Sequence, residues 1–228
     1  MKNLTIMLAL LFSIASHAQD CNSYFPMKKG TEMEITSFNK KDKKTGRSYM
    51  KVLDKKAMGN AMIAEMETTV YDKNAEQRAT NNYTVKCENG VLYFDMSQFV
   101  PDETLEAYKD MDVTMDGSQL ELPANAKVGD MLGNGTINIK VKNQGIQLVN
   151  LTIDITDRKV LTEEKVTTTA GTFDCIKISY NVKTDMGMMK FTTSVIEWHA
   201  KNVGMVKSES YNKKGEFTSK SELTSFKN

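Results

Sequence analysis

Short turns between runs of alternating polar and apolar residues constrain the fold of this chain most. Residues 31–38 alternate at a period of two, as a half-buried strand does. Residues 83–87 and 91–96 flank the turn Glu88-Asn89-Gly90, and Asn-Gly is a strong signal for a tight hairpin. Connections this short join antiparallel neighbours, because they leave no room for crossover helices. The pattern therefore predicts an antiparallel sheet built from successive hairpins.

The rest of the chain continues this texture. We expect further strands over residues 61–71, 137–142, 146–157, 159–168, 172–184, 188–198, 203–211 and 216–226. In the run 146–157, one clean apolar face is formed by Val149, Leu151, Ile153 and Ile155. About ten strands at this spacing predict a mainly β fold, a meander that curls into an open or incomplete β-barrel. A two-layer sandwich is the alternative.

One segment departs from the strand pattern. Pro101 suits the first turn of a helix, and Asp102 and Glu103 complement the helix dipole. Leu105, Tyr108 and Met111 then recur at helical spacing. We expect one short helix near 101–111 that covers one side of the barrel.

The first eighteen residues have the layout of a secretory signal peptide. Lys2 gives a basic start, residues 4–14 are almost wholly apolar, and small residues end the segment at Ala18. The apolar run is too short to span about 30 Å of hydrocarbon as a helix. We therefore expect residues 1–18 to be removed, residues 19–228 to form one β-rich domain, and the product to reach the periplasm, the cell surface or the medium. Cys21 raises the alternative of a lipoprotein, which the charged Asp20 directly before it disfavours.

The charges of the chain are balanced. There are 30 Lys and Arg against 29 Asp and Glu, and removal of Lys2 with the signal leaves a net charge of zero. No long-range field of one sign can then steer the protein onto nucleic acid or an anionic membrane. The basic stretch Lys40-Lys41-Asp42-Lys43-Lys44 contains an acid, and we interpret it as an exposed hairpin loop. Residues 19–228 contain no apolar stretch long enough to span a bilayer as a helix. We therefore expect that the mature chain is not an integral membrane protein.

Three cysteines remain after the signal: Cys21, Cys87 and Cys175. In an oxidising compartment one pair can form and one thiol is left over, and the spacing leaves all three pairings open. The alternative is that all three stay reduced as small apolar core residues. Their wide spacing excludes a CxxC redox motif and a zinc knuckle.

The sequence contains few residues that could support catalysis. His199 is the only histidine outside the signal. It follows Trp198 at the end of an expected strand, and we interpret the pair as residues at the edge of the hydrophobic core. Paired carboxylates could hydrolyse glycosides, but we interpret the available ones as solvated strand residues: Asp54, Asp95, Asp154 and Glu197. Phosphate-binding glycine motifs and metal-ligand spacings are absent. We expect no enzyme, no cofactor and no metal site.

The methionine content of the chain is unusually high. The chain has 16 methionines, and Met186, Met188 and Met189 fall in one expected turn. Flexible thioethers suit core filling and loop tips, and a Met-rich barrel interior would suit a lipid-like ligand. Copper binding by the three clustered methionines is a further alternative, although no histidine lies near them in the sequence.

Four segments together resemble a known group of proteins. They begin at Cys21 (CNSYFP), Cys87 (CENGVLYFDM), Ala170 (AGTFDC) and Glu197 (EWHAKNVGMVK). The chain resembles the TapB-like exported proteins of Bacteroidota, which are related to a broader periplasmic domain of unknown function. The resemblance implies an exported, mostly antiparallel β-domain without transferable catalytic residues.

Three residues of these segments are expected to be structural anchors. Gly171 permits a turn, Phe173 packs, and Trp198 supplies a large apolar group at a strand end. Two functions remain open. The first is a binding module for an apolar or lipid-like ligand of the cell envelope, and the second is a structural or interaction protein that contacts another envelope protein.

Overall fold

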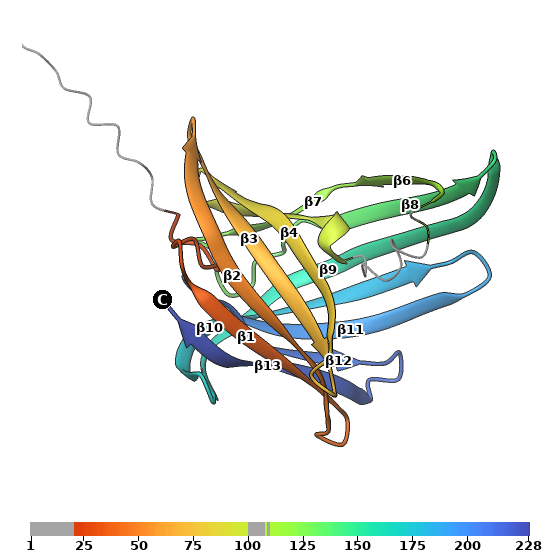
Figure 1. Ribbon diagram of the computed structural model, residues 1–228. Helices are drawn as coiled ribbons and strands as arrows, with labels where there is room; N and C mark the ends of the chain where they lie inside the picture. The colour runs from red at the N-terminus through yellow and green to blue at the C-terminus, as the bar shows by residue number, and fades with distance from the viewer. Residues whose placement is uncertain (1–20, 100–107, 109) are drawn as a thin grey trace, which may run out of the picture.

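The computed structural model of the protein describes residues 21–99, 108 and 110–228 (Figure 1). Thirteen strands form one antiparallel sheet, which curls into a nearly closed barrel with one unsealed seam. The strands are β1 (Glu32–Asn39), β2 (Lys44–Met58), β3 (Ala61–Asp72), β4 (Gln77–Glu88), β5 (Val91–Asp95), β6 (Asp112–Gly117), β7 (Gln119–Pro123), β8 (Gly135–Asn143), β9 (Ile146–Thr168), β10 (Gly171–Asp185), β11 (Lys190–Ala200), β12 (Gly204–Tyr211) and β13 (Phe217–Lys227). A short 3-10 helix, η1, spans Met96–Phe99.

The seam lies between β6 and β7, the two ends of the sheet order β6-β8-β9-β10-β11-β12-β13-β1-β2-β3-β4-β5-β7. Only Ser118 separates these two strands in the chain, yet β6 pairs with β8 and β7 pairs with β5. Strands β1 and β13 pair with each other, so the two ends of the described chain meet inside the sheet. The expected barrel is thereby confirmed, and the two-layer sandwich is wrong.

Several local expectations are confirmed. The turn at Asn89 and Gly90 has φ angles of 52° and 75°, both positive as a type I′ hairpin turn requires. On β9 the apolar face is buried at Leu151, Ile153 and Ile155. The basic stretch forms the turn between β1 and β2, where the amide of Asn39 donates to the carbonyl of Lys43 at 3.0 Å.

Other expectations are wrong. The strands expected over 146–157 and 159–168 form one strand of 23 residues, β9. Asp157 has a left-handed conformation (φ 58°), and the register with β10 shifts nearby. Such irregularities bend a strand without ending its pairing with the neighbouring strand. Strand β2 was not expected because its charged sequence obscures the alternation, and the short edge strands β6 and β7 were also missed. The helix expected near 101–111 falls largely on residues outside the described part of the chain.

The core consists of three clusters of buried side chains. The main cluster includes Val52, Met66, Leu92, Val160 and Ile178, contributed by β2, β3, β5, β9 and β10. A second cluster surrounds Trp198, Val206 and Leu223 of β11, β12 and β13, and a third joins η1 to β7, β8 and β9. Side chains therefore fill these three parts of the interior, as close packing requires.

Candidate binding site

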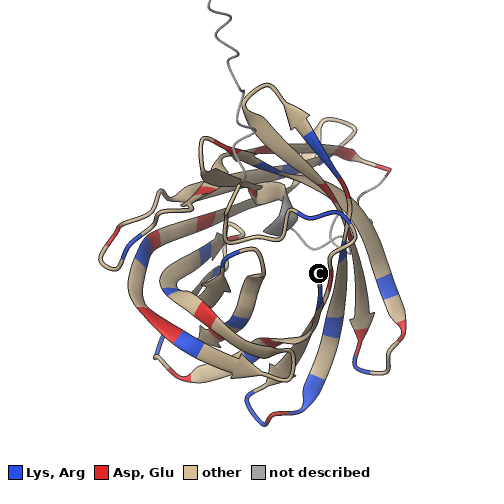
Figure 2. Cartoon of the chain, turned by 90° about the vertical axis from the view of Figure 1, so that its left-hand side faces the viewer, with Lys and Arg blue, Asp and Glu red and all other residues tan. Residues whose placement is uncertain are grey.

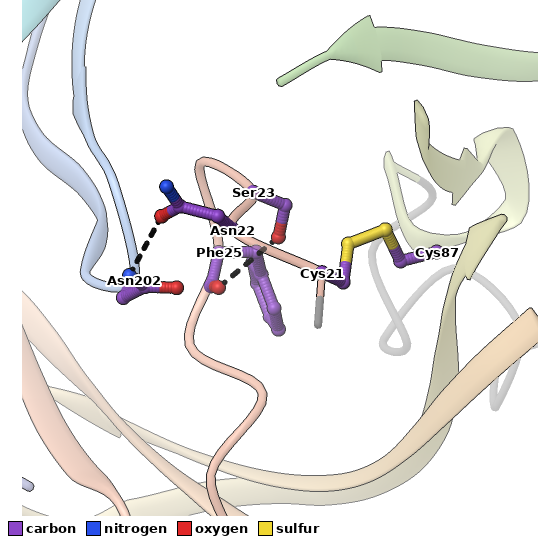
Figure 3. The surroundings of a disulfide bond; sticks show 6 residues. All are labelled: Cys21, Asn22, Ser23, Phe25, Cys87 and Asn202. Atoms are coloured by element: carbon purple, nitrogen blue, oxygen red, sulfur yellow. Dashed lines mark hydrogen bonds between the residues drawn. A yellow bond between two sulfur atoms is a disulfide. The ribbon is translucent and has the colours of Figure 1, made fainter. Parts of the chain in front are cut away.

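A disulfide anchors the segment that precedes β1. Cys21 is bonded to Cys87 of β4, with 6.2 Å between their Cα atoms and a sequence separation of 66 (Figure 3). Of the three pairings that the sequence leaves open, the structure contains this one, and Cys175 is free and buried. A Cys21 sulfur held in a disulfide cannot carry a thioether-linked lipid, which disfavours the lipoprotein alternative.

The same segment is also held by the turn between β11 and β12. The backbone amide of Asn202 donates a hydrogen bond to the carbonyl of Ser23 at 2.8 Å. Its side-chain amide donates to Oδ1 of Asn22 at 2.9 Å (Figure 3). This segment is thus attached to strand β4 and to the β11–β12 turn, and we call residues 21–27 the N-terminal strap.

An open cavity of about 660 Å³ lies beside the N-terminal strap. Its walls come from Tyr24 of the strap, residues 124–127 after β7, residues 163–165 of β9, residues 174–176 of β10, and Lys201. We call it the strap cavity. Since four separate segments converge on it and the strap is anchored at Cys21, Asn22 and Ser23, its shape is set by the tertiary structure.

The walls of the strap cavity combine an apolar floor with a charged rim. Tyr24, Ala126, Cys175 and Ile176 are all buried. On the rim, Lys165 pairs with Asp174 at 2.6 Å. A second rim acid, Glu164, accepts a hydrogen bond from the Trp198 indole. A floor of this kind favours an apolar group, and the rim supplies polar contacts.

Three rim charges have no ion-pair partner within the described chain: Lys127, Lys201 and Glu163. The Nζ atom of Lys201 lies 5.7 Å from the ring centre of Tyr24. Burial, assisted by the charge of Glu163, raises the pKa of Tyr24. Two unpaired ammonium groups against one unpaired carboxylate favour a ligand with an acidic group.

The free thiol of Cys175, which packs in the second core cluster, is not a nucleophile. Burial raises the pKa of Cys175 to about 12, and the charges of Asp174 and Glu164 act in the same direction. The reactive form of cysteine is the thiolate. Cys175 therefore serves as an apolar wall residue at neutral pH.

A second group of polar residues is buried on the core side of β11. Glu197 and His199 lie two residues apart and so share one face, opposite Ile178 and Ile176 of the main core. The Tyr180 hydroxyl donates to Oε1 of Glu197 at 2.7 Å, and Nε2 of His199 lies 2.8 Å from Oε2. The carboxylate thus has a partner on each oxygen.

Arg158 extends this group into β9. It is only 6% exposed, and its Nη1 donates to the carbonyl of Gly133 at 2.6 Å and to that of Glu121 at 3.0 Å. Burial lowers the pKa of Arg158, and the charge of Glu197 opposes that shift. We call Arg158, Tyr180, Glu197 and His199 the core polar cluster.

The electrostatics of the core polar cluster favour an ionised Glu197. Burial alone would raise its pKa, but the hydrogen bond and charge of His199, the Tyr180 hydrogen bond and the charge of Arg158 together hold the pKa below its usual range. Burial and Glu197 raise the pKa of Tyr180 well above its usual range. The carboxylate acceptor and phenol donor satisfy each other, so this geometry cross-links β10 and β11.

The interpretation of Glu197 as a solvated strand residue is therefore wrong, since its side chain is only 20% exposed. The interpretation of His199 with Trp198 as one core edge needs correction, because neighbours in a strand point to opposite faces. Sequence reasoning missed Arg158 and Tyr180. The signal that could have found Tyr180 is its even spacing from Ile178 and Ile176 on one strand face.

The remaining carboxylates named from the sequence lie apart, on β2, β5 and β9. Asp54 pairs with Lys29 at 3.1 Å, Asp95 caps η1 through the amide of Ser97, and Asp154 accepts from Thr136. In the described ranges, no three His, Cys, Asp or Glu side chains form a group that could hold a metal ion. Acidic and basic residues are interspersed along the strands, without a basic patch in the view of Figure 2.

The expected anchor residues lie in and beside the second core cluster. Trp198 is 5% exposed, and Phe173 packs edge-on against Phe226 with 6.3 Å between ring centres. Gly171 begins β10 at φ 136°, a conformation that side chains other than glycine rarely adopt. By contrast, the clustered methionines Met186, Met188 and Met189 lie exposed in the β10–β11 turn, outside the barrel core.

Known structures share this fold. A candidate exported protein with a YmcC-like fold from Bacteroides fragilis is 25% identical, with a TM-score of 0.73 over 91% of this chain and 100% of that chain. A candidate lipoprotein from Parabacteroides distasonis is 24% identical, with a TM-score of 0.75 over 92% of this chain and 100% of that chain. No curated protein matches this chain.

The first neighbour is described as exported and the second as a lipoprotein. No helix in the described segments is long and apolar enough to cross a membrane. The narrower TapB-like resemblance stays a prediction. Residues 28–223 match the model of the DUF3108-like family, a domain of unknown function, and the chain belongs to that family.

Proposed function

We propose that this protein is a non-enzymatic binding module of the cell envelope that holds a lipid-like, amphipathic ligand in the strap cavity. The observation that carries this proposal is a cavity of about 660 Å³ whose walls come from four segments and an anchored strap. Ligand sites are typically concavities of about 300–1,000 Å³ with apolar walls and a few polar groups. The predicted signal peptide and the TapB-like resemblance support the envelope location.

The wall chemistry supports the ligand class. The apolar part of the ligand would contact Tyr24, Ala126 and Ile176, where burial of apolar surface stabilises the complex. An acidic head group would lie at the rim beside Lys127 and Lys201. Charge-assisted hydrogen bonds from these ammonium groups are stronger than neutral ones.

Native mass spectrometry of protein purified from its own envelope tests this proposal. We expect a stoichiometric ligand that organic extraction removes. The double variant Lys127→Glu/Lys201→Glu should lose the ligand, whereas Lys43→Glu/Lys214→Glu, with the same charge change in two distant turns, should retain it. A wild-type protein that is free of ligand before extraction would overturn the proposal.

The seam favours a second candidate function. β6 and β7 each have a strand partner on one side only within the described sheet. An exposed strand edge is a template for pairing with another chain. A protein that co-purifies with a ligand-free mature chain would favour this structural or interaction role over ligand binding.

A further inference from the structure

A second open cavity, of about 410 Å³, lies on the sheet formed by β9, β10, β11 and β12. Its volume is within the range of about 300–1,000 Å³ that ligand sites occupy. It shares no lining residue with the strap cavity. We call it the polar cleft, and its walls include Asp157, Ser179, Asn181, Ser194, Ile196 and Tyr211.

One row of paired residues crosses the polar cleft. Asn181 of β10 pairs with Ser194 of β11, which pairs with Tyr211 of β12. Side chains of directly paired residues lie on the same face of a sheet. Nδ2 of Asn181 donates a hydrogen bond to Oδ2 of Asp157 on β9 at 3.0 Å, and Oγ of Ser194 donates to Oδ1 of Asn181 at 2.8 Å. A connected chain of polar groups therefore leads from a carboxylate toward an aromatic ring.

The aromatic ring of Tyr211 is held in place by two contacts. Its hydroxyl donates to Oε2 of Glu209 at 2.5 Å, and its ring lies edge-on to Phe217 with 6.0 Å between ring centres. Tyr211 is only half-buried and lines the cleft, so part of its surface is available to a ligand. A ring that is already fixed loses little conformational entropy when a ligand binds to it.

The polar groups of the cleft keep both donors and acceptors for a ligand. Asp157 accepts hydrogen bonds from Thr156 and Asn181, both at Oδ2, and its Oδ1 has no partner among the described residues. Within the same ranges the hydroxyl of Ser179 makes no hydrogen bond. Asn181 retains one amide hydrogen, and Ser194 retains its acceptor lone pairs. The free groups are therefore a mixture of donors and acceptors.

We propose that the polar cleft binds a neutral sugar residue of a glycan. A sugar ring has C–H groups on its faces and hydroxyls at its edge, and each hydroxyl both donates and accepts. The C–H groups would lie against Tyr211 and Ile196. The hydroxyls would bond to Oδ1 of Asp157, to the free amide hydrogen of Asn181 and to Ser179.

The same groups disfavour other classes of ligand. An apolar ligand would leave the polar groups of the cleft without partners, which is costly. An ammonium group has no acceptor for the amide hydrogen of Asn181. An anion would be repelled by Asp157, the only charged residue that the described chain contributes to the walls.

A ligand-observed NMR titration of the mature protein tests this inference. The probes are the neutral disaccharides cellobiose, lactose, mannobiose and N,N′-diacetylchitobiose, with spermidine as a cationic probe. We expect at least one disaccharide to bind and spermidine not to bind. Asn181→Ala and Tyr211→Ala should each weaken binding of that disaccharide about tenfold or more. Tyr211→Phe should bind like the wild type, because it keeps the ring and loses only the hydroxyl that bonds to Glu209.

Asn138→Ala is the matched control. Asn138 of β8 also accepts a cross-strand hydrogen bond, from Thr152 at 2.9 Å, but it does not line the polar cleft. Its variant should bind the sugar like the wild type, and a circular dichroism melt verifies that each variant folds. The inference is overturned if no disaccharide binds, if spermidine binds instead, or if Asn138→Ala weakens binding as much as Asn181→Ala does.

This inference is independent of the ligand proposed for the strap cavity. The Lys127→Glu/Lys201→Glu variant should still bind the disaccharide, because neither lysine lines the polar cleft. If that variant lost the sugar, the sugar site would be the strap cavity and the assignment to the polar cleft would be wrong.

Discussion

The indole nitrogen of Trp198 donates a hydrogen bond to Oε1 of Glu164 at 2.5 Å, and this bond joins β11 to β9 across the intervening β10. Lys177, on β10, lies between them, with its Nζ 4.9 Å from the centre of the indole ring and 3.5 Å from the Glu164 carboxylate. On the other side Lys207 of β12 also lies 4.9 Å from the ring centre. One side chain therefore connects four neighbouring strands.

Replacing Trp198 should destabilise the fold strongly. We expect Trp198→Ala to lower the free energy of unfolding by about 3–5 kcal/mol, because the ring is buried and its removal leaves a cavity. Urea denaturation followed by far-UV circular dichroism measures the change. Trp198→Phe is the comparison variant: it keeps an aromatic ring but loses the hydrogen bond to Glu164 and part of the ring volume, so it should cost less than Trp198→Ala. A loss below about 1 kcal/mol for Trp198→Ala would contradict the anchor role.

The disulfide should contribute to stability through the loop that it closes. With a sequence separation of 66 between Cys21 and Cys87, chain entropy predicts that Cys21→Ser/Cys87→Ser costs about 4 kcal/mol of unfolding free energy. Urea denaturation of the variant and of the oxidised wild type provides the comparison. Cys175→Ala serves as the control, because this thiol is not bonded to another cysteine. Alkylation of the unreduced, denatured protein should label Cys175 alone, and labelling of Cys21 or Cys87 would refute the pairing.

The core polar cluster should make stability depend on pH on the acid side. The folded state holds the pKa of Glu197 below its usual range, so the unfolded chain takes up a proton at a higher pH than the folded chain does. The stabilisation is then fully present above the usual range of glutamate and is lost as the pH falls through the lower, folded-state pKa. In Glu197→Gln this contribution is absent, and the difference in stability between wild type and variant should shrink with acidification.

Unfolding free energies measured across the acid range verify the sign of this effect. Asp116→Asn, which removes an exposed carboxylate from β6, is the control for the loss of one negative charge. A Glu197→Gln variant whose deficit stays constant with pH would show that Glu197 does not titrate differently in the folded and unfolded states.

The sequence predicted the turns and strand faces that depend on only a few neighbouring residues. The Asn89-Gly90 turn needs only two residues that tolerate positive φ, and the buried face of β9 needs only alternation. The same reasoning failed for β2, where Lys, Arg and Asp occupy strand positions that pair with β1 and β3. It also failed at Asp157, because a bulge bends a strand without a turn signal in the sequence.

The sequence by itself determined that this chain forms an antiparallel sheet of hairpins, because alternation and short turns are local properties. Only the tertiary structure decided which distant residues meet. Closure of the barrel brings Cys21 to Cys87 and Asn202 to Ser23, and strand register sets Tyr180 and His199 on the two oxygens of Glu197. Alternation reports which side chains share a face of one strand. It carries no information on which strand lies opposite, since pairing depends on register, bulges and the curvature of the whole sheet.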